Sequence, residues 1–182
     1  MLSTEYRHVT LEKPTLKDFN ETLPDAMPVT VILASRPGVT RWAGRQWEAV
    51  GVVVTTTNGG EGEVVVDQGD YQQVRYGGLE IRLFQDETES YYHNLMSPKP
   101  GCYIVATIDE EGENEVPVPI LVSLSFDQAN SYHEGGESVF AVPIPDELYG
   151  WVEAYVLQYY VPEKKRKRKL VNWKEKEKGK QQ

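Results

Sequence analysis

The sequence predicts an α+β domain with a curved, mainly antiparallel sheet, two late helices and a basic C-terminal tail. Two observations predict this class. Segments that are rich in β-branched residues, or that alternate apolar and polar residues, recur between turn residues through most of the chain. The two clear helical patterns appear late in the chain, after most of these strands. This order is typical of an antiparallel α+β domain, and it also fits closure of the sheet into a partial barrel.

The first half of the chain is predicted to form strands. Residues 27–35 form the first strand, and Arg36-Pro37-Gly38 follows as a turn. Residues 47–57 are β-branched almost throughout. A half-exposed strand would alternate apolar and polar residues, so we expect this segment at the centre of the sheet. Residues 63–67 form a short strand before the turn at Gln68-Gly69-Asp70.

A hairpin is predicted around Gly77-Gly78. Two glycines supply the positive φ that a two-residue hairpin turn needs, so residues 71–76 should pair with residues 79–84. The second of these strands has apolar residues at every other position, namely Leu79, Ile81 and Leu83. A period of two places one face of this strand on the core.

The second half combines strands with the two helices. Strands are predicted at residues 102–108, 116–124 and 138–142, and Pro117 and Pro119 place the start of the middle one at an edge. Ser125 with Gln128 fits a helix N-cap, and Gly135-Gly136 ends that helix. A last helix over residues 146–160 carries apolar residues at steps of three and four: Leu148, Trp151, Val152, Tyr155 and Tyr159.

Charge divides the chain into two parts. The net charge is −9, but residues 163–182 carry ten Lys or Arg and three Glu, a net +7. The remainder therefore carries −16. We expect a flexible arm at residues 1–26, one domain at residues 27–162 and a disordered basic tail at residues 163–182.

The sequence also indicates a compartment. Cys102 is the only cysteine, which excludes an intrachain disulfide and favours a reducing cytoplasm. The first residues lack the pattern of a secretory signal, and no apolar run is long enough to span a membrane. We therefore expect a cytoplasmic protein. Its oligomeric state does not follow from the sequence.

Catalytic motifs for nucleotide binding, zinc proteolysis and α/β-hydrolase chemistry are absent from the sequence. Glu87, Glu89 and His93 lie within seven residues and can act as general acid and base, or hold a metal with a further ligand such as His133. The alternative is a polar junction between strand and loop, and we favour it. Cys102, next to apolar residues, is predicted to be a buried filler. We therefore predict no catalytic residue, no metal site and no cofactor.

Two segments are candidates for binding. The first is a recognition patch whose members are polar or aromatic: Glu87, Glu89, Tyr91, Tyr92, His93 and Asn94. The second is a basic arm of six adjacent cations: Lys164, Lys165, Arg166, Lys167, Arg168 and Lys169. This arm can bind nucleic acid with Trp173 stacking on a base, anionic lipid, an acidic protein partner, or the acidic body of its own chain. The acidic segment 109–115 is predicted to be a solvated hairpin tip.

Several short motifs together resemble one family. Glu87-Thr88-Glu89-Ser90-Tyr91, Ser125-Phe126-Asp127-Gln128-Ala129 and Val142-Pro143-Ile144-Pro145 are similar, in order and spacing, to the bacterial family called domain of unknown function 3305 (DUF3305). The resemblance covers about residues 27–169. It implies an accessory role, because members of this family tend to be encoded beside subunits and maturation factors of molybdenum- or tungsten-dependent formate dehydrogenases. It implies no catalytic residue.

These observations leave three hypotheses about function. The resemblance favours a non-catalytic accessory protein that binds a formate dehydrogenase subunit or maturation factor. The basic arm favours a regulator that binds nucleic acid through residues 164–169, although the acidic body would repel a polyanion. The third is an enzyme that uses Glu87, Glu89 and His93 on a cofactor precursor.

Overall fold

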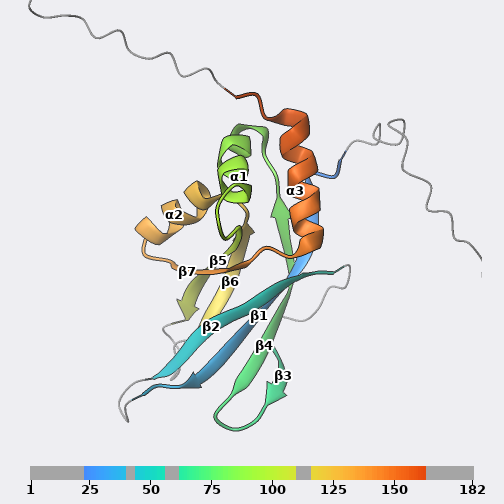
Figure 1. Cartoon of the computed structure of the whole chain (residues 1–182). Helices are drawn as coiled ribbons and strands as arrows, with labels where there is room; N and C mark the ends of the chain where they lie inside the picture. Colours follow the sequence, from blue (N-terminus) through green and yellow to red (C-terminus); the bar gives the residue numbers. More distant parts are fainter. Residues whose placement is uncertain (1–22, 40–43, 56–61, 110–115, 163–182) are drawn as a thin grey trace, which may run out of the picture.

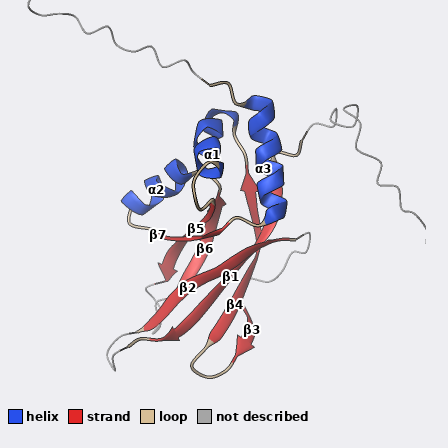
Figure 2. Cartoon of the chain, in the orientation of Figure 1, coloured by secondary structure: helices blue, strands red, loops and turns tan. Residues whose placement is uncertain are grey.

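The computed structural model describes residues 23–39, 44–55, 62–109 and 116–162. In this part of the chain, seven strands form two antiparallel sheets, and three α-helices gather at one end of the molecule (Figures 1 and 2). The predicted α+β class is confirmed. The sheets do not close into a partial barrel, and a third helix joins the two that were predicted.

Four strands form the first sheet. They are β1 (Ala26–Pro37), β2 (Arg45–Val54), β3 (Glu63–Asp67) and β4 (Gln72–Arg82), in the spatial order β2-β1-β4-β3. The predicted central place of residues 47–57 is wrong, because β2 pairs only with β1 and lies at an edge. Along β2, exposed positions alternate with more buried ones, and its β-branched run includes the exposed Val50 and Val53. β1 takes a central position instead.

The Gly77-Gly78 pair forms no hairpin turn. β4 is a single strand through both glycines and pairs along its length with β1. At the glycines the register shifts, so that two residues of β4 lie opposite the single residue Thr30. Gly78 has a φ of +76°, the conformation that a β-bulge often requires. The positive φ inferred from the sequence is therefore present at Gly78, but it belongs to a bulge within a strand and not to a hairpin turn. The predicted alternation after it is confirmed, with Ile81 and Leu83 buried.

Three strands form the second sheet. They are β5 (Gly101–Asp109), β6 (Val116–Ser123) and β7 (Ser138–Pro143), in the spatial order β6-β5-β7. The predicted edge position of Pro117 and Pro119 is confirmed, since β6 pairs only with β5. β6 lies next to β4, and β7 lies next to β2, yet no strand pairing joins the two sheets within the described residues. The two sheets are therefore neighbours at these two seams without a shared ladder of backbone hydrogen bonds among the described residues.

The helices are α1 (Thr88–Leu95), α2 (Phe126–Glu134) and α3 (Asp146–Tyr159). The predicted cap of α2 is confirmed, because Ser125 Oγ accepts a hydrogen bond from the backbone N–H of Gln128 at 3.1 Å. The predicted stripe of α3 is buried, apart from the half-buried Tyr159. None of the helices described is long and apolar enough to cross a membrane.

The core is shared by both sheets and the helices. Its buried members include Val31, Leu33 and Ile81 of the first sheet, Ile104 and Val122 of the second, and Leu148 and Val152 of α3. The chain just before β1 is bonded to this body: Trp151 Nε1 donates to the Pro24 carbonyl at 2.8 Å, and Leu83 N donates to the Asp25 carbonyl at 2.7 Å. Most of the predicted arm, residues 1–22, and the basic tail, residues 163–182, lie outside the described residues.

Candidate functional site

The predicted recognition patch folds into a short 3-10 turn, η2 (Gln85–Glu87), and the helix α1. The sequence pattern predicts an irregular polar junction here, and that prediction is wrong. The pattern does not indicate the helix because the buried side chains of α1 are largely polar, namely Thr88, Ser90, Tyr91 and Asn94. α1 packs against α2 and α3 at the helical end of the molecule (Figure 1). It is therefore part of the folded body.

Three members of the patch hold the fold together. Asn94 Nδ2 donates to the carbonyl oxygens of Gly101 at 2.7 Å and Leu124 at 2.9 Å, and Asn94 Oδ1 accepts from Gly101 N at 2.9 Å. Tyr91 is 1% exposed, its hydroxyl accepts from Phe84 N, and burial raises its pKa to about 12. Tyr92 stacks on Tyr160, with ring centroids 4.8 Å apart. Asn94 and Tyr91 therefore offer no free polar group at the surface, and the half-buried Tyr92 packs its ring against the end of α3.

Glu87 belongs to a hydrogen-bonded network that joins α1 to α2. Ser125 Oγ lies 2.6 Å from Glu87 Oε2, to which it donates, and 3.0 Å from Ser90 Oγ. The same Ser125 oxygen caps α2, so one hydroxyl group satisfies a helix end and a carboxylate together. Glu87 therefore has a structural partner.

Glu89 and His93 lie apart from Glu87. They are four residues apart on α1, with 3.6 Å between His93 Nε2 and Glu89 Oε1, and the side chains of His93 and Glu89 are 65% and 66% exposed. Residues two apart on a helix face different directions, so Glu87 does not join this pair. Within the described residues, no group of three or more His, Cys, Asp or Glu side chains is placed to hold a metal ion. The three predicted acid-base residues are not brought together.

A small hollow of about 310 Å³ lies between α1, α2 and β5. Its lining includes Ser97, His93 and Asp127, the residue types of a hydrolytic triad. Among the described residues, no hydrogen bond links His93 to either of the other two, and Ser97 Oγ is buried without a partner. The residue types of a triad are present without the hydrogen bonds that activate a serine.

Cys102 lies in the core. It is 0% exposed, and burial raises the pKa of its thiol to about 12, so the thiolate is scarce at neutral pH. The prediction of a buried apolar filler is confirmed.

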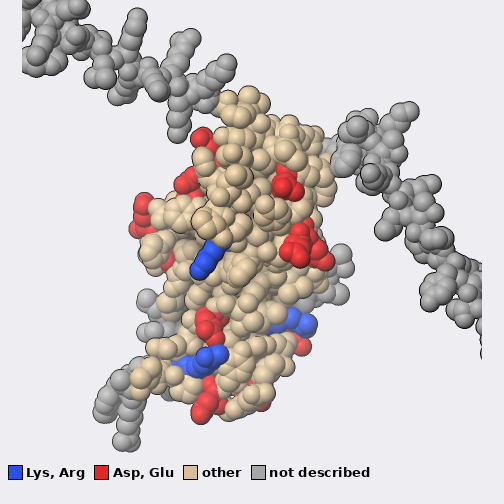
Figure 3. Space-filling model, viewed as in Figure 1, with Lys and Arg blue, Asp and Glu red and all other residues tan. Residues whose placement is uncertain are grey.

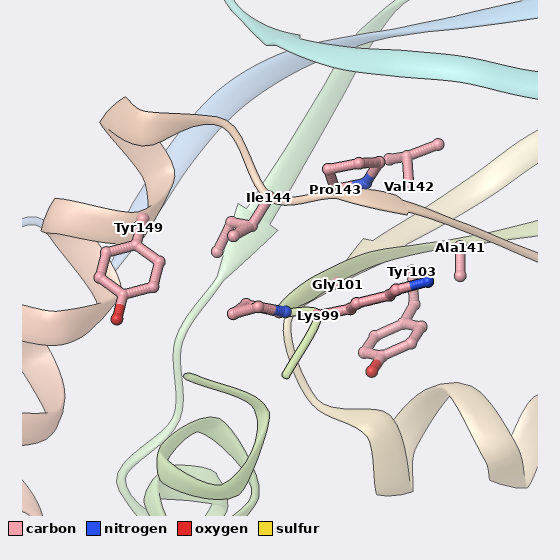
Figure 4. A pocket seen from close by; sticks show the side chains of 9 residues that line it. Lys99, Gly101, Tyr103, Ala141, Val142, Pro143, Ile144 and Tyr149 are labelled. Atoms are coloured by element: carbon pink, nitrogen blue, oxygen red, sulfur yellow. The ribbon is translucent and has the colours of Figure 1, made fainter. Parts of the chain in front are cut away.

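An apolar groove lies beside the predicted patch, where β5, β7 and the start of α3 meet (Figure 4). It has a volume of about 570 Å³. Its lining is mostly apolar or aromatic and consists of Lys99, Pro100, Gly101, Tyr103, Ala141, Val142, Pro143, Ile144 and Tyr149. Tyr103 also lines the hollow that contains His93, so the groove and the exposed face of α1 are neighbours. We call this feature the β5–β7 groove.

Charge around the groove is uneven. Lys99 is the only lysine in the described part of the chain, and it makes no ion pair there. In Figure 4 its side chain extends along the groove toward Ala141. The surrounding helical end, residues 83–98 and 125–162, contains nine Asp or Glu and no Lys or Arg. On the face drawn in Figure 3, acidic side chains likewise outnumber basic ones. Lys99 is thus an isolated cation within an acidic surface.

The model of the family described as "Protein of unknown function (DUF3305)" matches residues 28–169. The chain belongs to the DUF3305 family. No curated protein and no solved structure matches it. The DUF3305 match includes all three helices and every residue of the β5–β7 groove.

The sequence pattern does not predict the groove. Ser97-Pro98-Lys99-Pro100-Gly101 reads as a break between elements, and the one signal of a binding surface there is a lone lysine between two prolines in an acidic body. Tyr149 and Ile144 join the groove only because α3 returns to the end of β5, which no local pattern predicts. Two predicted features lie wholly or largely outside the described residues: the basic arm at residues 164–169, and the acidic tip at residues 109–115, of which only Asp109, the last residue of β5, is described.

Proposed function

We propose that this DUF3305 protein is a non-catalytic accessory protein that binds a subunit or maturation factor of a molybdenum- or tungsten-dependent formate dehydrogenase. Membership of the family supports the proposal, through the accessory role that the resemblance implies. The β5–β7 groove is the observation that carries it, because this groove supplies a binding surface on rigid elements.

The groove has the chemistry of a protein-binding surface. Hydrophobic and aromatic side chains that line a concave surface lose water when a partner's side chains enter. Tyr103 and Tyr149 are of the type that often dominates binding energy. The volume of about 570 Å³ suits a few apolar side chains of an extended segment.

Lys99 sets the orientation of the bound segment. A carboxylate of the partner would neutralise its charge, while the acidic helical end favours basic residues at the flanks. Charges of this kind govern association rate and register more than affinity. We therefore infer a partner segment that is apolar at its centre, with one acidic residue near Lys99.

The test uses Ala141→Asp in a host that lacks the chromosomal gene. Ala141 is exposed on β7 and lines the groove, and Lys99 extends toward it (Figure 4). A carboxylate at position 141 therefore competes with the partner's carboxylate for Lys99 and places a polar group in the apolar interface, without disturbing the core. We expect co-purification of formate dehydrogenase proteins to fall about tenfold or more, because the lost ion pair and the buried polar group together cost more than about 1.4 kcal/mol. Metal and cofactor content per formate dehydrogenase should fall with it.

Ile120→Asp is the matched control. Ile120 is 45% exposed on β6, in the same sheet but outside the groove, so this variant should behave as wild type. The proposal fails if the wild-type protein recovers no formate dehydrogenase subunit or assembly factor. It also fails if gene deletion leaves the cofactor loading of the enzyme unchanged.

A further inference from the structure

A second hollow lies between the first sheet and the start of β6. It has a volume of about 430 Å³, within the usual range for small-molecule sites. Its lining residues are Arg45, Trp47, Gly62, Val64, Gln72, Val74, Tyr76, Val116 and Val118. None of them lines the β5–β7 groove, so this hollow is a separate feature.

Arg45 gives the hollow a positive charge. Arg36, Arg75 and Arg82, the other arginines of the described residues, each form an ion pair with a glutamate. Arg45 has no carboxylate partner among the described residues, and no other described residue of the lining is charged. Its charge is therefore available to an anion.

Hydrogen bonds fix the Arg45 guanidinium in place. Arg45 Nε donates to Ser35 Oγ at 3.0 Å, and Nη2 donates to the carbonyl oxygens of Ser35 at 3.3 Å and Asp70 at 3.4 Å. In the described residues Nη1 makes no hydrogen bond, which leaves two N–H donors. A guanidinium that is already held loses little freedom when it binds a carboxylate.

Trp47 adds a second unused donor. Its indole Nε1 is buried and has no hydrogen-bond partner among the residues that the structure describes. A buried donor without an acceptor is unusual in a folded protein, and an acceptor on a ligand would satisfy it. By contrast, Trp151 Nε1 donates to the Pro24 carbonyl.

We propose that this hollow binds a small molecule with an apolar, flat body and a carboxylate or similar anionic end. The body lies against Trp47, Tyr76 and the lining valines, while the anion accepts hydrogen bonds from Arg45 Nη1 and Trp47 Nε1. This site is independent of the proposed partner-binding groove.

The test follows the indole N–H signals of the full-length, ¹⁵N-labelled protein by NMR. Trp47→Phe assigns the Trp47 signal. The probes are 4-phenylbutyrate, 4-phenylbutanol and 4-phenylbutylamine, which share a body and differ in the charge of one end. We expect the carboxylate to shift the Trp47 signal, to leave Trp151 unchanged and to bind about tenfold more tightly than the alcohol, with the amine weakest.

Arg45→Gln should lower the affinity for 4-phenylbutyrate about tenfold and abolish its preference over the alcohol. Arg75→Gln is the matched control, because Arg75 lies in the same sheet, outside the lining, with its charge paired to Glu63. An unmoved Trp47 signal overturns the proposal, as does equal binding of the three probes to wild type. Those wild-type titrations decide the matter even if a variant fails to fold. Neither outcome bears on the groove, which Ala141→Asp tests.

Discussion

At the scale of single residues, Asn94 shows how a polar side chain holds a core. Its amide joins α1 to the start of β5 and to Leu124, the residue after β6, through three hydrogen bonds. All the atoms involved are buried, so water does not replace the amide when it is lost. Asn94, which the sequence suggested for recognition, therefore stabilises the packing of α1 against the second sheet.

Asn94→Ala should destabilise the protein by about 3 kcal/mol, because it leaves the Gly101 N–H and two carbonyl groups without this partner. Urea unfolding measures the loss. Asn130→Ala is the control: its side chain bonds to Glu134 at the surface of α2, and its removal should cost less than about 0.5 kcal/mol. Equal losses in the two variants would contradict the anchoring role of Asn94.

At the scale of elements, the bulge in β4 adapts a long strand to its neighbour. β4 has one more residue than β1 across the paired segment, and Gly78 absorbs it with a positive φ. The bulge lies between the half of β4 that pairs with both β1 and β3 and the half that pairs with β1 alone. It leads the strand toward the buried Ile81 and Leu83 and then into η2 and α1.

Gly78→Ala should cost about 1–2 kcal/mol, because a side chain raises the energy of the left-handed conformation. Gly51→Ala is the control, since Gly51 has no positive φ and a Cβ there meets no atom within 4 Å. That change should be neutral or slightly stabilising. The two variants are compared by thermal unfolding, and a neutral Gly78→Ala would exclude strain at the bulge.

Local patterns in the sequence were enough to find most elements. Turn residues and β-branched runs located β1, β3, β5, β6 and β7, and the Ser125 cap located α2, because each depends on neighbours in the chain. Residue pattern did not reveal α1, whose buried face is polar, or the edge position of β2, which depends on pairing with distant strands. The β5–β7 groove forms from residues that are distant in the sequence, so the spacing of residues along the chain does not predict it.

At the scale of the whole molecule, one core unites the two sheets with the helices α1 and α3. Buried residues from every strand except β3 join a single cluster with residues of α1 and α3. Because the sheets share no strand pairing in the described residues, this cluster is what makes them one folding unit.

Ile104→Ala tests this unity. Ile104 is fully buried in β5, so its truncation should cost about 2–5 kcal/mol. Tryptophan fluorescence and far-UV circular dichroism should report the same single urea transition, shifted equally, although Ile104 belongs to the second sheet and Trp47 to the first. Ile108→Ala, at an exposed position of the same strand, should shift it little. Separate transitions in the Ile104 variant would mean that the sheets unfold independently.

The two seams also affect how the molecule meets copies of itself. The edge strand of an open sheet has unpaired backbone N–H and C=O groups that can pair with a strand of another chain, and many β proteins aggregate in this way. Here β2 and β7 run next to each other, and the outer strand β6, interrupted by prolines, runs next to β4. The remaining border, β3, is short and has an acidic residue at each end. Each sheet thus covers edge strands of the other and hinders their pairing with strands of another chain, although no backbone ladder joins the two sheets among the described residues.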